Sequence, residues 1–189
     1  MIPLSFYENP DVVDIAKKLL GKLLLTKIDG VLTGGYITET EAYAGVVDKA
    51  SHAYAGRRTK RTDVMYAPGG VTYVYLCYGI HSLLNIVTGD KDIPHAVLIR
   101  AIKPCIGTEI IQERRKHTYP LASGPGTLTQ ALGITRKENG LSLLSERLWL
   151  EEGTTVSSIK VSPRIGIDYA EEDASLPYRF IAQLANMEI

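Results

Sequence analysis

Residues 22–41 read KLLLTKIDGVLTGGYITETE, two runs rich in apolar and β-branched residues with Asp29–Gly30 between them. An Asp-Gly pair in this setting favours a two-residue β-turn, because both turn positions require positive φ and these residues tolerate it. The pattern predicts strands over Lys22–Ile28 and Val31–Glu41, joined as a hairpin. We therefore expect the chain to begin its sheet with an antiparallel strand pair.

A second hairpin is indicated by Val71–Tyr78 and His81–Thr88, which are rich in aromatic and aliphatic residues and flank Gly79–Ile80. Glycine at the first central position favours a type II′ turn, so we expect this pair to form the tip. Ala96–Ile102 is a further apolar run of strand length. Hairpins that follow one another in sequence build antiparallel sheets.

Helical patterns lie apart from these strands. Asn9 is suited to cap a first helix that starts at Pro10 and has an apolar stripe up to Leu20, with Gly21 to end it. Further helices are expected over Gly107–Lys116 and Pro125–Leu132, and further strands over Arg147–Leu150, Ile159–Ile167 and Tyr178–Leu184. Hairpins with helices set apart indicate an α+β fold on a mainly antiparallel sheet.

The composition is that of an ordinary globular domain. The chain has 189 residues, of which 45% are hydrophobic and 22% charged, and this suits one domain over residues 1–189. No apolar run approaches the roughly 20 residues of a membrane-spanning helix, and Met1–Pro10 shows no signal-peptide pattern. We therefore expect a cytoplasmic protein that does not associate with membranes.

The two cysteines, Cys77 and Cys105, are too few for a four-ligand zinc site, and the four histidines show no ligand spacing with them. We expect both thiols to be buried and reduced. The cysteine and histidine pattern therefore gives no indication of a zinc site.

The charges are balanced in number but uneven in distribution. There are 21 basic and 21 acidic residues, and a net charge of zero weighs against a general nucleic-acid binder. Residues 42–70 show no periodicity and are long for a loop, which indicates a functional surface. This segment holds a run of basic residues without acidic ones, namely Lys49, Arg57, Arg58, Lys60 and Arg61. Such a cluster either neutralises phosphates or forms a solvated loop.

Two carboxylates end the second predicted strand. Alternation puts Glu39 and Glu41 on the same face, with Tyr43 beyond them. A carboxylate in a partly dry pocket can act as a general base, whereas a solvated strand end with cross-strand ion pairs needs no catalytic role. Arg100 ends an apolar run and, if buried, requires a carboxylate, for which Glu41 is a candidate.

Aromatic and amide side chains supply a second set of candidates. Tyr73 and Tyr75 share one face of a predicted strand, and Tyr78 stands at the hairpin tip. Aromatic faces can stack on nucleobases and a protruding side chain can enter a duplex, although tyrosines in strands also fill cores. His52 is either a pocket residue or incidental. Asn85, inside an apolar strand, must find polar partners or select a ligand.

Separated motifs occur in a fixed order along nearly the whole chain: Glu39-Thr40-Glu41-Ala42-Tyr43, Ser51-His52, Tyr73-Val74-Tyr75-Leu76-Cys77-Tyr78-Gly79, Asn85, Val97-Leu98-Ile99-Arg100-Ala101, Ser123-Gly124-Pro125 and Arg164-Ile165-Gly166. This ordered set resembles the alkyladenine (3-methyladenine) DNA glycosylase family, and it is more specific than any one short motif. The resemblance implies a single domain with a curved, mainly antiparallel, open-barrel-like sheet, flanking helices and a protruding β-hairpin. It implies no metal and no cofactor.

The resemblance also implies roles for individual residues. Glu41 matches the glutamate that deprotonates the attacking water, while Arg100 and the backbone carbonyl of Ile165 match the groups that help hold this water. The base pocket would be formed by Tyr43, His52, Tyr75, Asn85 and Leu98, with the amide of Asn85 excluding normal guanine. Tyr78 would fill the gap left in the duplex. The DNA backbone would be met by Arg57, Thr59, Lys60 and Arg61.

The implied function is that of a monofunctional DNA glycosylase in base excision repair. It would flip a damaged purine out of double-stranded DNA and hydrolyse the N-glycosidic bond, leaving an abasic site. We expect a monomer, associated with the nucleoid if the source is prokaryotic. The lesion range stays open among 3-methyladenine, 7-methylguanine, hypoxanthine and ethenoadenine. His81 stands where the family often has an aromatic residue.

Two other functions fit parts of the sequence. A nucleic-acid-binding module without catalysis would use the basic cluster and the tyrosines but leave Glu41 and Arg100 without a purpose. A sugar hydrolase would use Glu39 and Glu41 as an acid–base pair, but such enzymes place their carboxylates on opposite sides of the bond.

Overall fold

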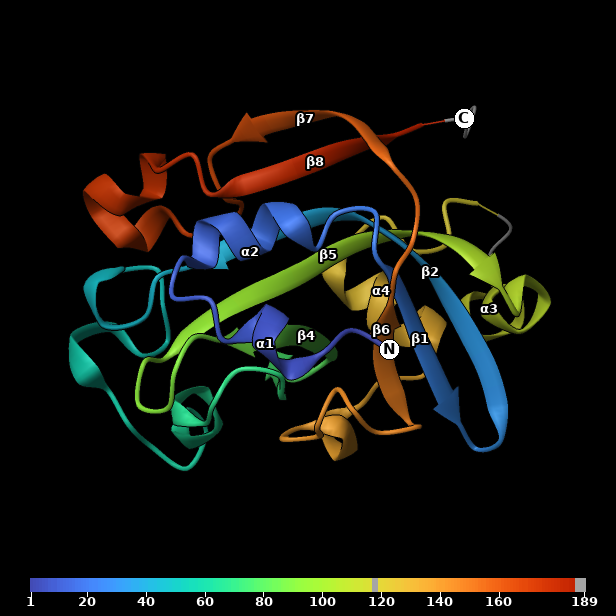
Figure 1. The fold of residues 1–189 in the computed structure, drawn as a ribbon, viewed down its shortest axis with the longest axis horizontal. Coiled ribbons are helices and arrows are strands. Elements are labelled where there is room, and N and C mark those ends of the chain that lie inside the picture. Colours follow the sequence, from blue (N-terminus) through green and yellow to red (C-terminus); the bar gives the residue numbers. More distant parts are fainter. Residues whose placement is uncertain (117–118, 186–189) are drawn as a thin grey trace.

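Two long strands, β2 (Val31–Tyr43) and β5 (His95–Ile106), pair antiparallel in the middle of the sheet (Figure 1). The computed structural model describes residues 1–116 and 119–185. Within these residues the sheet has eight strands in the order β3-β4-β5-β2-β1-β6, and β7 joins it through β8, which pairs with β2. The remaining strands are β1 (Leu23–Ile28), β3 (Thr72–Cys77), β4 (His81–Thr88), β6 (Leu148–Glu151), β7 (Val156–Ser162) and β8 (Arg179–Leu184).

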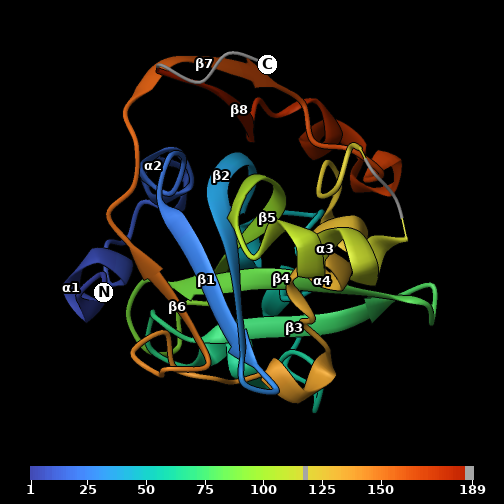
Figure 2. The same ribbon diagram turned by 90° about the vertical axis from the view of Figure 1, so that its right-hand side faces the viewer.

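The sheet is curved and open. β2 is long enough to pair along one edge with two strands in turn, with β1 over residues 31–36 and with β8 over residues 39–41. Figure 2 shows β3 and β4 running across the direction of β1 and β2, so that the sheet bends without closing. The predicted α+β fold on a curved antiparallel sheet is confirmed.

The first predicted hairpin is also confirmed. β1 and β2 pair in register from Leu23 opposite Tyr36 to Ile28 opposite Val31. Asp29–Gly30 forms the turn, and both residues have positive φ, 53° and 80°. Two successive positive φ angles are typical of the type I′ turn that an Asp-Gly pair favours.

The second hairpin is present, but its tip is shifted by one residue. The predicted Gly79–Ile80 type II′ turn is wrong, because positive φ occurs at Tyr78 (50°) and Gly79 (71°). The Ile80 N–H donates to the Cys77 carbonyl at 3.1 Å and closes the turn around these two residues. A tyrosine with positive φ is unusual, and here it leaves the Tyr78 side chain 93% exposed at the end of the hairpin.

Helix α2 (Val12–Lys18) is shorter than predicted, and its cap is Asp11 rather than Asn9. The Asp11 carboxylate accepts hydrogen bonds from the N–H groups of Val13 and Asp14, whereas Asn9 accepts from the N–H of Asp11. Both residue types are good caps, and a carboxylate is further stabilised at the positive end of a helix. A four-residue helix, α1 (Leu4–Tyr7), precedes it and was not predicted.

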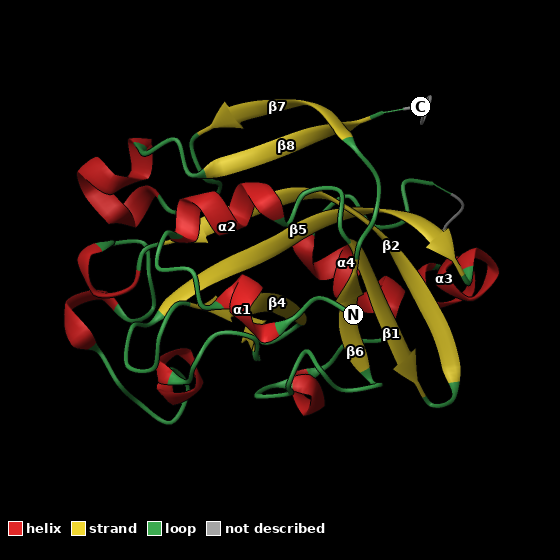
Figure 3. Cartoon of the chain, in the orientation of Figure 1, coloured by secondary structure: helices red, strands yellow, loops and turns green. Residues whose placement is uncertain are grey.

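The other helices cover the sheet (Figure 3). α4 (Pro125–Leu132) has the predicted bounds and packs against β4 and β5 with Leu128, Ala131 and Leu132 buried in the core. α3 (Thr108–Arg115) packs against α4. Among the described residues, no helix is long and apolar enough to span a membrane.

Two further expectations are wrong. The strand predicted over Ile159–Ile167 ends at Ser162, because Pro163 has no N–H for a ladder and the chain turns away there.

β5 continues to Ile106, beyond the predicted end, and this extension carries Cys105 out of the core. Cys105 is therefore exposed and Cys77 is half-buried, and both are free thiols.

Candidate active site

A cavity of about 460 Å³ opens where β2, β3, β4 and β5 meet the segment that follows Pro163. This volume is within the usual range of small-ligand sites. Its lining brings together most of the residues predicted to be functional, namely Tyr43, His52, Arg61, Tyr75, Tyr78, Asn85, Leu98, Arg100 and Ile165, and it also includes Tyr73. Glu41 lies behind this lining with no exposed surface and contacts three of its members.

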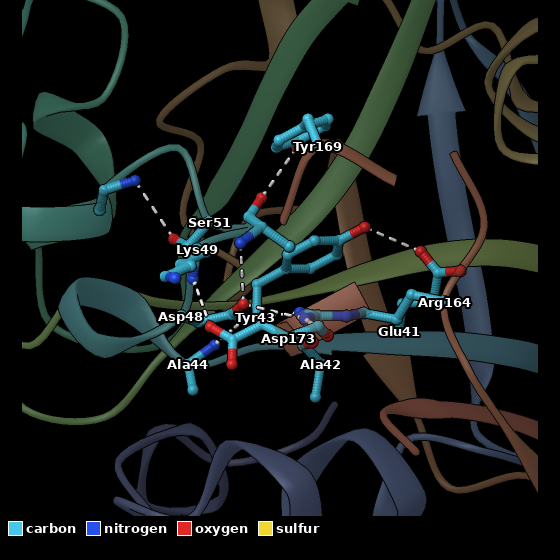
Figure 4. A network of polar contacts seen from close by, with 12 residues as sticks. Glu41, Ala42, Tyr43, Ala44, Asp48, Lys49, Ser51, Arg164, Tyr169 and Asp173 are labelled. Carbon is cyan, nitrogen blue, oxygen red and sulfur yellow. Dashed lines mark hydrogen bonds and ion pairs between the residues drawn. The ribbon is translucent and has the colours of Figure 1, made fainter. Parts of the chain in front are cut away.

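The Glu41 carboxylate is held by donors from three elements. One oxygen accepts a hydrogen bond from the Tyr43 hydroxyl at 2.9 Å, the contact at the right of Figure 4. The other oxygen accepts from the Ile165 backbone N–H at 2.9 Å. It also lies 3.4 Å from Nη1 of Arg100. The alternative of a solvated strand end is therefore wrong for Glu41.

Burial and hydrogen-bonding or charged partners change the pKa of Glu41 in opposite directions. Burial is the largest cause and raises the pKa of Glu41, whereas Arg100, the Ile165 N–H and the Tyr43 hydroxyl lower it; the net direction is upward. The pKa of Tyr43 is raised by burial and by the charge of Glu41, so its hydroxyl keeps its proton and donates. A carboxylate with a raised pKa, at the back of a cavity, is suited to accept a proton from water.

An irregular register in the sheet aims Arg100 at this carboxylate. The pairing of β2 with β5 passes over Thr38 on one strand and Arg100 on the other, and such bulges commonly redirect side chains next to functional sites. Arg100 Nε donates to Glu39 at 2.8 Å, and Arg179 of β8 donates to the same oxygen at 2.6 Å. The expected contact of Arg100 with Glu41 is present, but its closer partner is Glu39.

One rung across the sheet carries several of these residues. Tyr73, Asn85, Leu98, Glu41 and Arg179 are successive partners on β3, β4, β5, β2 and β8. Directly opposite residues place their side chains on the same face of a sheet. The register therefore lines up the floor of the cavity with the carboxylate.

Aromatic rings form one wall of the cavity. The rings of His52 and Tyr75 lie 4.7 Å apart between centroids, and those of Tyr73 and Tyr75 lie 5.3 Å apart. His52 Nδ1 is 2.9 Å from the Tyr73 hydroxyl, a contact that sequence reasoning missed. Burial, followed by the positive charges of Arg61 and Arg57, lowers the pKa of His52 to about 4. His52 is therefore neutral near pH 7 and does not repel a cationic ligand.

Asn85 is fixed within the floor. It is buried, and its side-chain N–H donates to the Tyr73 carbonyl at 3.1 Å. A buried amide held in one orientation presents a fixed polar group to whatever enters, and such groups discriminate strongly between ligands. Leu98, its partner on β5, supplies an apolar surface beside it.

The basic residues of the loop over residues 57–61 have different surroundings. Arg58 forms ion pairs with Asp63 and Asp92, at 2.7 and 3.0 Å. The Thr59 N–H donates to the Thr62 hydroxyl at 2.9 Å within a turn. Arg61 lies over the Tyr75 ring, 4.8 Å from its centroid, and reaches the cavity rather than only the surface. The side chains of Arg57 and Lys60 are exposed.

Comparison with known proteins places this arrangement in a family. The family model described as "Methylpurine-DNA glycosylase (MPG)" matches residues 5–186. The chain belongs to the methylpurine-DNA glycosylase family. Three relatives carry provisional names as 3-methyladenine DNA glycosylases. The Chlamydia felis protein is 48% identical over 97% of both chains, the Bacillus cytotoxicus protein 46% over 96% of this chain and 95% of its own, and the Bacillus subtilis protein 43% over 95% and 91%.

This member of the methylpurine-DNA glycosylase family has a second, larger cavity, which is lined by different kinds of residue. It measures about 980 Å³ and lies between β5, α3 and the β7–β8 ribbon. Its lining among the described residues includes Lys103, Lys160 and Tyr119 but no carboxylate and no histidine. The groups needed for proton transfer to or from water therefore gather at the smaller cavity.

The exposed basic residues give a prediction about DNA binding by this family member. Replacing Arg57 or Lys60 by alanine is expected to lower the slope of log affinity against log salt by about 1 for each phosphate that the variant no longer neutralises. Lys27→Ala is the control, because Lys27 is exposed in the β1–β2 hairpin at the opposite end of the molecule (Figure 1). Fluorescence anisotropy over a salt series measures the slopes. Equal slopes in all variants would place the DNA surface elsewhere.

Proposed function

We propose that the protein is a monofunctional DNA glycosylase that excises alkylated purines from double-stranded DNA and leaves an abasic site, acting as a monomer. The observation that carries this proposal is a fully buried carboxylate, Glu41, held at the back of an aromatic cavity beside Arg100. The family relationship supports a DNA substrate.

The cavity suits a purine that has been rotated out of the helix. Extrusion costs a few kcal/mol, and stacking on aromatic side chains offsets part of it. Tyr43 and Tyr75 supply ring faces, with the neutral His52 beside them. An alkylated purine such as 3-methyladenine carries positive charge, which ring faces attract by roughly 0.5–2 kcal/mol.

Glu41 then acts on a water molecule. The positive charge makes the base a good leaving group, so the reaction needs activation of water more than protonation of the base. The ionised Glu41 accepts the proton of the attacking water, and its negative charge stabilises the oxocarbenium character at the sugar. Arg100 and the backbone of Ile165 position the water and the carboxylate.

The nucleophile is water rather than an amine. No lysine lines the cavity within the described part of the chain, and an enzyme that cleaves the strand through a Schiff base requires such an amine. Selectivity against normal guanine comes from the fixed amide of Asn85, which the guanine amino group would meet.

Glu39 does not support the alternative of a sugar hydrolase. Both Arg100 and Arg179 bind its carboxylate, and of these two partners only Arg100 lines the cavity, whereas Glu41 contacts three lining residues. Glu39 and Glu41 both contact Arg100, so they do not face each other across a bound bond as an acid–base pair would.

The direct test is base release from methylated duplex DNA. Free bases are quantified by chromatography, and the strands are analysed before and after alkali. We expect methylated purines to be released with strands intact until alkali is added. Binding of the DNA without base release would favour a binding module instead, and strand cleavage without alkali would contradict the monofunctional chemistry.

The hairpin tip gives a prediction about duplex opening. Tyr78→Ser is expected to weaken binding to damaged duplex by about 1–3 kcal/mol, the usual contribution of a base–aromatic stack, while release from single-stranded DNA is retained. Leu32→Ser is the control, because Leu32 is an exposed apolar residue of β2. Excision rates on both substrates are compared. Equal losses on single and double strands would contradict a role in filling the duplex.

A further inference from the structure

A buried ion pair lies next to Tyr43, one of the donors to the proposed catalytic carboxylate. Arg164 is 5% exposed, and its two terminal nitrogens bind the two carboxylate oxygens of Asp48 at 2.5 and 2.9 Å. Arg164 also donates to the Ala42 carbonyl at 2.9 Å and to the Asp173 carbonyl at 3.2 Å (Figure 4). It thereby connects the segment after β7 to the end of β2.

Asp48 is itself fixed by the loop that follows β2. Its carboxylate accepts hydrogen bonds from the backbone N–H groups of Ala44 and Ala50, at 2.9 and 3.0 Å. Both ends of the ion pair are therefore attached to backbone by hydrogen bonds.

The guanidinium of Arg164 also supports an aromatic wall of the cavity. It lies 4.8 Å from the ring centroid of Tyr43 and 5.3 Å from that of Tyr178. Its Nε is buried without a hydrogen-bond partner among the described residues. The Arg164 guanidinium thus leaves one donor without a partner, while it stacks on two rings and binds Asp48.

Two of the three donors to Glu41 depend on this pair. Tyr43, whose hydroxyl donates to Glu41, stacks on Arg164, and Ile165, whose N–H donates to Glu41, is the next residue in the chain. We propose that Asp48 and Arg164 are positioning residues of the glycosylase, which hold the Tyr43 hydroxyl and the Ile165 N–H on the Glu41 carboxylate. This inference rests on the proposed function.

The chemistry of the pair favours positioning over simple stabilisation. A buried ion pair carries a desolvation cost, and well-packed apolar residues often stabilise a fold as well. The planar guanidinium, however, fixes the relative orientation of its partners, which a lysine with a single ammonium group does not do.

Loss of these two donors is expected to raise the pKa of Glu41. The charged and titratable groups around it are Arg100 from β5, Glu39 and Tyr43 from β2, and Arg164 behind Tyr43. The hydrogen bonds from Tyr43 and Ile165 lower the pKa of Glu41 against the effect of burial. If these hydrogen bonds are lost, the pKa of Glu41 rises. The acid limb of the pH–rate profile, where the rate falls because Glu41 becomes protonated, then moves to higher pH.

The test compares Arg164→Lys and the isosteric Asp48→Asn with Glu138→Gln. Glu138 is equally buried and binds Arg147 through two hydrogen bonds, at 2.9 and 2.6 Å. Its other side-chain partner is Thr135, so it contacts none of the donors to Glu41. For each protein, the melting temperature, the affinity for damaged duplex and the single-turnover rate of base release are measured from pH 5 to 9.

We expect Arg164→Lys and Asp48→Asn to lower the single-turnover rate by roughly 100-fold, as misplacement of catalytic groups does, and to move the acid limb upward by about one pH unit. Glu138→Gln should lose stability while keeping the wild-type rate and pH profile. If Arg164→Lys does not fold, Asp48→Asn carries the same comparison. Wild-type rates in both positioning variants, or an unshifted acid limb, would overturn the inference. Absence of base release by the wild type would instead overturn the proposed function.

Discussion

Replacing Glu41 by glutamine is expected to lower single-turnover base release by about 100- to 10,000-fold, the usual contribution of a general base, while damaged duplex remains bound. Glutamine has the same shape and can still accept a hydrogen bond from the Tyr43 hydroxyl, but it cannot take a proton from water. Binding is retained because the aromatic wall of Tyr75 and His52 does not depend on the Glu41 charge.

Glu39→Gln is the matched control for this experiment. Glu39 lies two residues away on the same strand and also contacts Arg100, but its other partner is Arg179, which does not line the cavity. We expect a much smaller loss of rate in this variant. Activity of Glu41→Gln close to that of the wild type, with affinity unchanged, would contradict the assignment of Glu41 as the general base.

The second large effect concerns Arg100 and pH. Only an ionised carboxylate accepts a proton, so the rate is lost as the pH falls through the pKa of Glu41. Arg100 lowers this pKa. Arg100→Met therefore raises it, and the acid limb of the rate profile is expected to move to higher pH by about 1 to 3 units, the usual effect of one nearby opposite charge. Single-turnover rates measured from pH 5 to 9 give the position of the limb.

Arg179→Met separates this effect from a general loss of charge. Arg179 binds Glu39 from β8 at 2.6 Å but forms no ion pair with Glu41. We expect its acid limb to stay near that of the wild type. If both variants shift the limb equally, the charge of Arg100 does not act directly on Glu41, and the arginine instead supports the fold around it.

The hairpins and the best-defined helix could be predicted from local sequence. Asp29–Gly30 can satisfy a type I′ turn, and Pro125–Leu132 has a proline at its start and Gly133 with positive φ after its end. Local signals failed where two residues close together in sequence could occupy the same structural position. Asp11 rather than Asn9 caps α2, and Tyr78 rather than Ile80 shares the turn with Gly79.

The geometry of the site could be predicted only in part. The motif order predicted Glu41 and Arg100 as site residues, but the bulge that turns Arg100 toward two carboxylates depends on the pairing of β2 with β5. Similarly, the contact of Arg164 with Asp48 joins positions 116 residues apart. Such contacts arise from tertiary packing, and no periodicity or turn preference in one strand encodes them.

The rung formed by Tyr73, Asn85, Leu98 and Glu41 has a consequence for how this enzyme can change over generations. Inserting or deleting one residue within any of the four strands would turn its side chains to the opposite face and remove one component of the site. Lengthening the loop over residues 54–62 or the turn at Tyr78–Gly79 leaves the rung in place. Lineages can therefore vary the segments that we propose meet DNA through changes in length, whereas the strands beneath the cavity can change only by substitution.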